Sequence, residues 1–228
     1  MKIIAHRGFS ELYTENTFLA FTKAIESGAD GIETDIRLSL DGHAILFHDR
    51  SLKRLANLDK EPRELKLEEL QEISLANDQY IPSLDELLEL CEDKISLVLE
   101  IKYHLKTYKK LIQIINLLIK DKLHWIEVSC FEDTVLEELH KLNKDIKLHK
   151  LIEDADIIED EYFHKKYAYI SCFDINVKLA RLALRKGLIK DKKVIFWTVD
   201  DEDISQEIKE GLYAVMTNNP QKLKEKYD

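Results

Sequence analysis

The segment GIETDIRLSLDGHAILFH spans residues 31–48 and joins two short apolar runs through an Asp-Gly pair. Glu33 and Asp35 stand two residues apart in the first run, so on a strand their side chains point to the same face. Ile32 and Ile36 flank them and indicate that the strand is buried. Burial of ionised carboxylates is costly unless they are paired or bind a cation. The segment therefore predicts a buried strand that carries functional carboxylates.

Similar short runs, rich in β-branched and aromatic residues, recur along the chain and alternate with amphipathic segments. The expected strands are Lys2–Ala5, Gly31–Leu38, Ile95–Ile101, Trp125–Ser129, Ile146–Leu151, Tyr167–Ser171, Lys193–Thr198 and Ala214–Thr217. The expected helices are Thr17–Ser27, Leu84–Cys91, Tyr108–Lys120, Glu132–Leu142, Val177–Lys186, Glu202–Glu210 and a short one from Pro220. A weak and very acidic helix is expected near Ala155–Lys165, after the fifth strand.

Eight strands, each followed by a helix, predict an α/β fold, namely a TIM (β/α)8 barrel with a short insertion after the second strand. A doubly wound open sheet is the alternative, but no Gly-x-Gly-x-x-Gly motif follows the first strand. No Pro/Gly/Ser-rich linker, repeat or low-complexity segment divides the chain. We therefore expect one domain over residues 1–228, with the insertion at about residues 51–80.

The composition excludes some classes of partner. A formal net charge of −10, with no basic stripe to offset it, argues against a nucleic-acid partner. Cys91, Cys130 and Cys172 are odd in number and far apart, which is typical of reduced thiols. The sequence shows no secretory signal and no transmembrane stretch, so we expect a cytoplasmic protein without stable membrane insertion. Nothing in the sequence indicates an oligomeric state.

Polar residues gather where several expected strands end. His6 and Arg7 follow the first strand, Glu100 and Lys102 end the third, and Trp197 lies at the end of the seventh. The active site of a TIM barrel lies at the C-terminal ends of its strands. The barrel fold therefore predicts that these side chains share one site with the carboxylates of the second strand.

His48 is expected to join this site through a hairpin. Asp41-Gly42 is a strong two-residue turn signal, and a turn there pairs Leu40 with His43 and Asp35 with His48. Residues opposite each other on paired strands point to the same face. The prediction depends on the turn, because a slip of one residue would turn His48 to the other face.

The residue types fit the cleavage of a phosphodiester. Glu33, Asp35 and Glu100 would repel one another without a cation, and oxygen ligands favour Mg²⁺ or Ca²⁺. Arg7 and Lys102, which follow or end two of the strands, are cations that suit phosphate oxygens. Two histidines, His6 and His48, suit the two proton transfers of a hydrolysis. A phosphodiester is the substrate that this set explains best.

An ordered series of motifs resembles the glycerophosphodiester phosphodiesterase family from the N-terminus to about Pro220. The motifs are His6-Arg7-Gly8, Glu15-Asn16-Thr17, Glu33-Thr34-Asp35, His48-Asp49, Ile81-Pro82-Ser83-Leu84, Glu100-Ile101-Lys102 and Trp197-Thr198-Val199. The resemblance implies a TIM barrel that hydrolyses glycerophosphodiesters to an alcohol and glycerol 3-phosphate, with one divalent cation, in glycerol and lipid metabolism. It also implies that a hydroxyl of the glycerol can attack first and give a cyclic phosphate.

The resemblance implies a role for each residue of the motifs. His6 and His48 correspond to the general acid and base, and Glu33, Asp35 and Glu100 to the metal ligands. Arg7 and Lys102 correspond to the phosphate-binding residues. Trp197 is either a packing residue or a wall of the substrate site.

The chain departs from the family pattern at three places, one of which is Cys130, where a serine is common. The last strand ends in Thr217-Asn218-Asn219-Pro220, whereas an aspartate is usual at the position of Asn218, and Lys53-Arg54-Leu55 replaces a usual Arg-Thr-Thr stretch. These changes bear on the choice of alcohol more than on the reaction. Asn16 is interpreted as the N-cap of the first helix.

Two other functions remain as alternatives. A phospholipase D-like lipid hydrolase on the same barrel would need an apolar surface at the barrel mouth, but the candidate loops are mostly charged. A non-catalytic barrel that binds a phosphate ligand would be expected to lose a histidine or a metal carboxylate, and this chain keeps all five. Both considerations favour hydrolysis of a small glycerophosphodiester.

Overall fold

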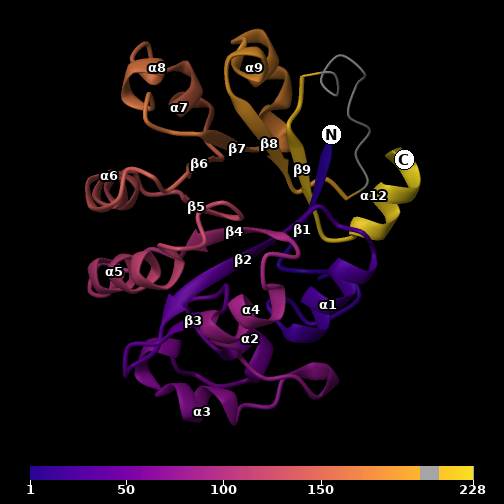
Figure 1. Ribbon diagram of the computed structural model, residues 1–228, viewed down its shortest axis with the longest axis vertical. Helices are drawn as coiled ribbons and strands as arrows, with labels where there is room; N and C mark the ends of the chain where they lie inside the picture. The colour runs from indigo at the N-terminus through magenta and orange to yellow at the C-terminus, as the bar shows by residue number, and fades with distance from the viewer. Residues whose placement is uncertain (201–210, 228) are drawn as a thin grey trace.

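The computed structural model describes residues 1–200 and 211–227 and shows a closed β/α barrel (Figure 1). Eight parallel strands form the ring, which closes because β1 pairs with both β2 and β9. In ring order the strands are β1 (Lys2–His6), β2 (Gly31–Leu38), β4 (Ser96–Ile101), β5 (Ile126–Cys130), β6 (Leu148–Ile152), β7 (Cys172–Asn176), β8 (Lys193–Trp197) and β9 (Ala214–Thr217). A short strand, β3 (Ala44–Leu46), pairs antiparallel with β2.

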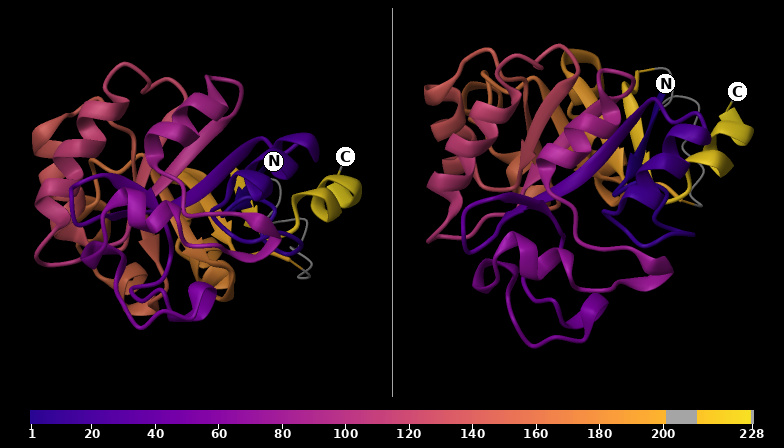
Figure 2. Two further views of the ribbon diagram at one scale, coloured as in Figure 1. Left: turned by 90° about the horizontal axis from the view of Figure 1, so that it is seen from below. Right: turned by 60° about the horizontal axis from the view of Figure 1, so that its bottom comes forward.

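Helices surround the ring and bury their apolar faces against it (Figures 1 and 2). They are α1 (Phe18–Glu26), α4 (Leu84–Cys91), α5 (Tyr108–Ile119), α6 (Asp133–Leu142), α7 (Ala155–Glu159), α8 (Phe163–Lys166), α9 (Ala180–Arg185), α10 (Leu188–Asp191) and α12 (Pro220–Tyr227). A short 3-10 helix, Val177–Leu179, precedes α9. Among the helices of the described residues, none combines the length and the apolar character needed to cross a bilayer.

The TIM-barrel prediction is confirmed, and most expected elements lie within a few residues of their predicted bounds. The acidic segment expected as one weak helix forms two short ones, α7 and α8. The helix expected over Glu202–Glu210 lies outside the described residues.

The prediction of the sixth parallel strand was wrong. The aromatic run Tyr167–Ser171 was expected to form it, but the strand begins only at Cys172. Tyr167 instead ends α8, and its ring packs edge-on against Phe163 and Phe173. The hydrophobic pattern misplaced this strand because the real strand contains a charged residue, Asp174, whose carboxylate is fully buried.

The register of the hairpin was also wrong, by one residue. Leu38 pairs with Ala44 and Arg37 with Ile45, because the loop holds three residues rather than two. Ser39 donates its backbone N–H to His43, and Gly42 adopts a φ of +95° that favours glycine. The Ser39 hydroxyl also donates to the Asp41 carboxylate, at 2.7 Å, which holds the turn. Phe47, rather than His48, therefore lies opposite Asp35.

The segment after β3 folds against the side of the barrel with a hydrophobic cluster of its own (Figure 2). It contains α2 (Lys53–Ala56), the 3-10 helices Pro62–Glu64 and Ala76–Asp78, and α3 (Leu67–Gln71). The buried members of the cluster are Ile45, Phe47, Leu52, Leu65, Leu70, Leu75 and Ile81. Since Ile45 and Phe47 flank the end of β3, the segment is anchored directly beside the residue that follows them, His48.

Candidate active site

An open cavity of about 280 Å³ lies at the C-terminal ends of the strands. It is lined by His6, Arg7, Glu33, His48, Glu100, Lys102, Ser129, Phe131, Leu151, Glu153, Trp197, Thr198 and Met216. Every site residue expected from the sequence is in this lining except Asp35, which is fully buried among the lining residues. The structure thus brings the predicted residues into one place.

Three buried carboxylates form the floor of the site. Glu33, Asp35 and Glu100 each offer an oxygen, and these three atoms lie within 4.8 Å of one another. Lys102 Nζ contacts both Asp35, at 2.9 Å, and Glu100, at 2.5 Å. Arg7 Nε lies 3.2 Å from Asp35 Oδ2. Glu100 and Lys102 are both largely buried, so theirs is not a surface ion pair.

The charges of these carboxylates are strongly perturbed. Burial raises the pKa of Glu33 well above its usual range, and the nearby Asp35 and Glu100 raise it further. Burial, with Asp35 second, raises the pKa of Glu100 to about 7. Burial opposes ionisation of Asp35 too, but Lys102 and Arg7 outweigh it and hold the pKa of Asp35 well below its usual range. The floor thus holds more acidic groups than its two cations can keep ionised.

The donor set fits a divalent cation of the Mg²⁺ or Ca²⁺ type. All three groups are carboxylates, which are the ligands that these hard cations prefer. The Oε1 atom of Glu33 is buried and accepts no hydrogen bond from residues 1–200 or 211–227. A buried acceptor without a donor is unfavourable, and a cation would satisfy it.

His6 is oriented by the end of the last strand. Its Nδ1 lies 2.8 Å from Oδ1 of Asn218, and Asn218 donates its amide group to Asp200 at 2.7 Å. Because Asp200 accepts from the nitrogen of the amide, the amide oxygen faces His6 and accepts a hydrogen bond from its Nδ1–H. Burial, with Arg7 second, lowers the pKa of His6 to about 4. His6 is therefore a neutral imidazole whose Nε2 carries a lone pair, 3.9 Å from Glu33.

His48 reaches the cavity although the hairpin register differs from the prediction. It lies two residues beyond the end of β3, where strand alternation no longer sets its direction. Arg37 fixes its backbone by donating to the His48 carbonyl at 2.6 Å. Its Nδ1 lies 2.7 Å from Asp49 Oδ1, so Nδ1 donates and Nε2 is the nitrogen that can exchange a proton. Burial also lowers the pKa of His48, which Asp35 partly offsets.

A chain of ion pairs connects the two sides of the site. Arg54 on α2 pairs with Asp49, at 2.6 Å, and donates two hydrogen bonds to Glu15, at 2.7 and 2.9 Å. Glu15 in turn accepts from Arg7 at 3.0 Å. The neighbour of His48 and the neighbour of His6 are thus joined through one surface arginine.

The turn after β1 depends on Gly8. Arg7 and Gly8 both have positive φ angles, of 58° and 81°. A Cβ at Gly8 would lie 2.7 Å from the backbone of Ala20 on α1, so only glycine fits there. The turn directs the Arg7 backbone N–H to Glu33 Oε2, at 3.1 Å, and its guanidinium toward Asp35.

The interpretation of Asn16 as a helix cap was wrong, because Thr17 is the N-cap of α1. Asn16 is buried, has a φ of 57° and donates to Asp35 Oδ2 at 2.8 Å. Its amide oxygen accepts from the Thr34 hydroxyl at 2.7 Å and from the Asp35 backbone at 3.3 Å. Asn16 therefore fixes a carboxylate of the site. The sequence prediction missed the functions of two residues. Asn16 belongs to the motif Glu15-Asn16-Thr17, whereas Asn218 was noted only as a departure from the family pattern.

One wall of the cavity is apolar. Phe131 and Trp197 meet edge to face at 5.8 Å, and Leu151 and Met216 line the same cavity. Trp197 also donates its indole N–H to the carbonyl of Asp174 at 2.9 Å. Trp197 therefore packs against its neighbours and also forms part of the cavity wall.

The chain is similar to known proteins in both sequence and fold. A model of the glycerophosphoryl diester phosphodiesterase family matches residues 6–222. A glycerophosphodiester phosphodiesterase from Caldanaerobacter subterraneus is 31% identical, over 97% of this chain and 95% of its own length. The crystal structure of such an enzyme from Thermotoga maritima is 29% identical, with a TM-score of 0.84 over 98% of this chain and 96% of its own.

A phosphodiesterase from Oleispira antarctica, solved with its product sn-glycerol-3-phosphate, shares the fold with a TM-score of 0.87 at 23% identity, over 99% of this chain and 96% of its own. The match of the family model over nearly the whole chain confirms the resemblance drawn from the motifs. The chain therefore belongs to the glycerophosphoryl diester phosphodiesterase family, a family of phosphoric diester hydrolases.

Proposed function

We propose that this protein hydrolyses small glycerophosphodiesters to an alcohol and glycerol 3-phosphate. The observation that carries the proposal is the meeting of two histidines, three carboxylates and two cationic side chains on one cavity at the barrel mouth. The relative from Caldanaerobacter subterraneus, named for this activity, supports it at 31% identity. A cytoplasmic location and a place in glycerol and lipid metabolism belong to the same proposal.

In this proposal Glu33, Asp35 and Glu100 hold one Mg²⁺ or Ca²⁺ ion. The cation would supply positive charge for the phosphoryl oxygens as they become more negative. Arg7 and Lys102 lie beside the carboxylates and would bind the phosphate, Arg7 through its planar fork and Lys102 as a point charge. Their pairing with Asp35 holds both in place before substrate enters.

The two histidines would carry the proton transfers. One imidazole, in its neutral form, takes the proton of the attacking hydroxyl as the new P–O bond forms, and the other, entering as the imidazolium, donates its Nε2 proton to the leaving alcohol oxygen as its P–O bond breaks. If the attacking hydroxyl is that of the glycerol, water then opens the cyclic phosphate with the two roles exchanged, which gives glycerol 3-phosphate. Asn218 and Asp49 each accept from Nδ1 of one histidine, which leaves Nε2 for this exchange. Because the nitrogens are fixed before reaction, little reorganisation is needed.

A panel of four substrates tests the proposal. Turnover of glycerophosphocholine, glycerophosphoethanolamine, glycerophosphoglycerol and a lysophospholipid is measured with and without added Mg²⁺ or Ca²⁺. We expect hydrolysis of soluble diesters and little of the lysophospholipid, because the cavity is small and the loops expected at the barrel mouth are mostly charged. Preference for the lysophospholipid would favour a lipid hydrolase, and binding without turnover would favour a non-catalytic barrel.

Removal of the Asn16 side chain should weaken the cation site. Asn16→Gly keeps the positive φ but deletes the hydrogen bond to Asp35, and loss of such a supporting partner lowers metal affinity by about 10- to 100-fold. The measurement is the concentration of Mg²⁺ or Ca²⁺ that gives half-maximal activity. Asn57→Gly is the control, because Asn57 has a φ of 54° at an exposed position. Equal metal requirements for both variants would contradict the role of Asn16.

A further inference from the structure

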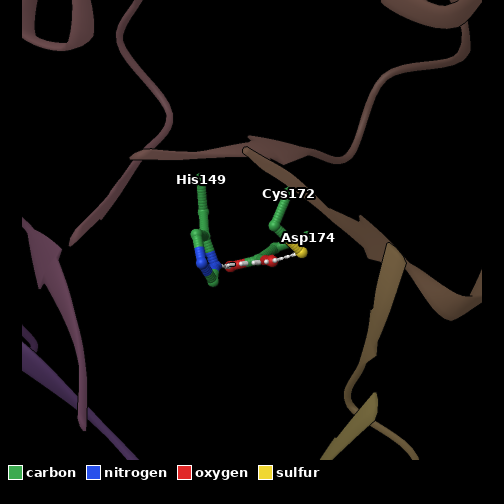
Figure 3. Close-up of side chains that lie close together, drawn as sticks. All are labelled: His149, Cys172 and Asp174. Atoms are coloured by element: carbon green, nitrogen blue, oxygen red, sulfur yellow. Dashed lines mark hydrogen bonds and ion pairs between the residues drawn. The ribbon is translucent and has the colours of Figure 1, made fainter. Parts of the chain in front are cut away.

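A second group of buried potential ligands lies deeper in the barrel, away from the cavity. His149 on β6 and Cys172 and Asp174 on β7 are all at most 1% exposed. Figure 3 shows their side chains pointing toward one another from these neighbouring strands. Cys172 packs with Ile4 and Ile195, which places the group inside the ring of strands. The activity proposed above uses none of the three.

Two of the three separations between these ligand atoms are close to the edges of a tetrahedral zinc site. Nδ1 of His149 lies 3.0 and 3.1 Å from the two carboxylate oxygens of Asp174, and Cys172 Sγ lies 3.5 Å from Asp174 Oδ1. Usual zinc–ligand lengths give a tetrahedral N···O edge of about 3.3 Å and an S···O edge of about 3.5 Å. These two separations are therefore close to those that a shared ion would impose, and all three ligand atoms lie within 4.8 Å of one another.

Glu127 on β5 supplies the supporting partner that metal-bound histidines usually have. Its carboxylate lies 2.6 Å from Nε2 of His149, on the opposite side of the imidazole from Asp174. A metal-ligating histidine typically donates its second ring N–H to a carboxylate, which fixes the tautomer. In the metal-free protein Nδ1 donates to Asp174; when a metal takes the place of that proton, Glu127 would keep the proton on Nε2 and leave the Nδ1 lone pair for the ion.

We propose that His149, Cys172 and Asp174 form a second metal site, which takes Zn²⁺ or a similar transition-metal ion. One nitrogen, one sulfur and one oxygen suit such ions, whereas the all-oxygen floor of the cavity suits Mg²⁺ or Ca²⁺. Binding forms three bonds, from Nδ1, Sγ and a carboxylate oxygen, and releases the Nδ1 and thiol protons to solvent. The two positive charges of the ion replace the two protons, so the buried charge is unchanged.

The end of the barrel formed by the N-terminal ends of the strands, opposite the proposed active site, offers a path to this metal site. A cavity of about 40 Å³ opens there and is lined by Glu127, Ile4 and Ile195, among others. Glu127 extends from it to His149, and Ile4 and Ile195 pack against Cys172. The cavity is large enough for water, so an ion can approach without passing through the proposed active site.

Titration of the metal-free wild-type protein with Co²⁺, a spectroscopic substitute for Zn²⁺, tests the proposal. We expect a thiolate-to-cobalt charge-transfer band that saturates at one equivalent and disappears when Zn²⁺ is added. The oxygen ligands of the cavity floor cannot produce this band, so a failure of the proposed hydrolysis would leave the result unaffected. Absence of the band in the wild-type protein would overturn the proposal, whatever any variant does.

Two cysteine variants identify the ligand. Cys172→Ala should abolish the charge-transfer band, and Cys91→Ala should keep it, because Cys91 is an equally buried thiol on α4, outside the group. Elemental analysis after Zn²⁺ loading should show one zinc ion fewer in Cys172→Ala than in Cys91→Ala. Circular dichroism establishes that each variant is folded. A band that persists in folded Cys172→Ala would contradict the assignment.

Discussion

Replacement of His6 or His48 by alanine should lower kcat by about 100- to 10,000-fold, the usual contribution of a positioned general acid or base. Both side chains line the cavity, and each has its Nδ1 held by a partner, so little else can supply the proton at the same place. Steady-state hydrolysis of a soluble glycerophosphodiester measures the effect. His43→Ala is the matched control, since His43 lies in the same hairpin with half of its side chain exposed.

A change of leaving group separates the two roles. A glycerophosphodiester whose alcohol is p-nitrophenol needs no proton on departure, so the variant that lacks the acid should recover much of its rate. The variant that lacks the base should not recover. If either alanine variant keeps a near-normal rate on the natural type of substrate, that histidine has no part in the mechanism.

Chelation of divalent cations should abolish hydrolysis, and Mg²⁺ or Ca²⁺ should restore it. Arg7 and Lys102 offset only part of the charge of the three buried carboxylates, and a divalent cation would offset the rest. Glu33→Gln and Glu100→Gln should each lower kcat by at least about 100-fold at a fixed metal concentration, as loss of electrostatic stabilisation generally does. The measurement is activity after treatment with EDTA and after addition of each metal.

Glu153→Gln provides the control for the carboxylate variants. Glu153 lines the same cavity but is exposed and stands apart from the group of three. Its variant should keep both its rate and its metal requirement. Hydrolysis that continues unchanged after thorough chelation would refute the cation site, even if the glutamine variants were inactive for other reasons.

The barrel was predictable because its signal is repeated. Each strand is a short apolar run before an amphipathic helix, and errors of a residue or two do not change that alternation. The failure at β7 has a physical cause. Hydrophobicity favours Tyr167–Ser171, but the strand itself contains Asp174, whose burial depends on His149 from another strand. A pairing between side chains on different strands has no local signature.

The candidate site was predictable to a different degree for different residues. His6, Glu33 and Glu100 could be located because a barrel brings the ends of its strands together. His48 was located by a hairpin register that the structure contradicts. Asn16 and Asn218 were missed because their function lies in hydrogen bonds to Asp35 and His6, and amides of this kind are equally common in caps and turns.

The ion pairs of Arg54 limit how this barrel can diversify. The segment after β3 is the natural place to vary the choice of alcohol, since it follows directly on His48, which lines the cavity, without belonging to the ring of strands. Yet Arg54 in this segment pairs with two carboxylates of the site. One is Asp49, which follows His48, and the other is Glu15, which also pairs with Arg7. A substitute segment that lacks a guanidinium at this point would leave Glu15 paired with Arg7 alone and Asp49 with His48 alone, and the added negative charge beside the site would repel an anionic substrate. Loop exchange among such barrels is thus constrained by charge as well as by shape.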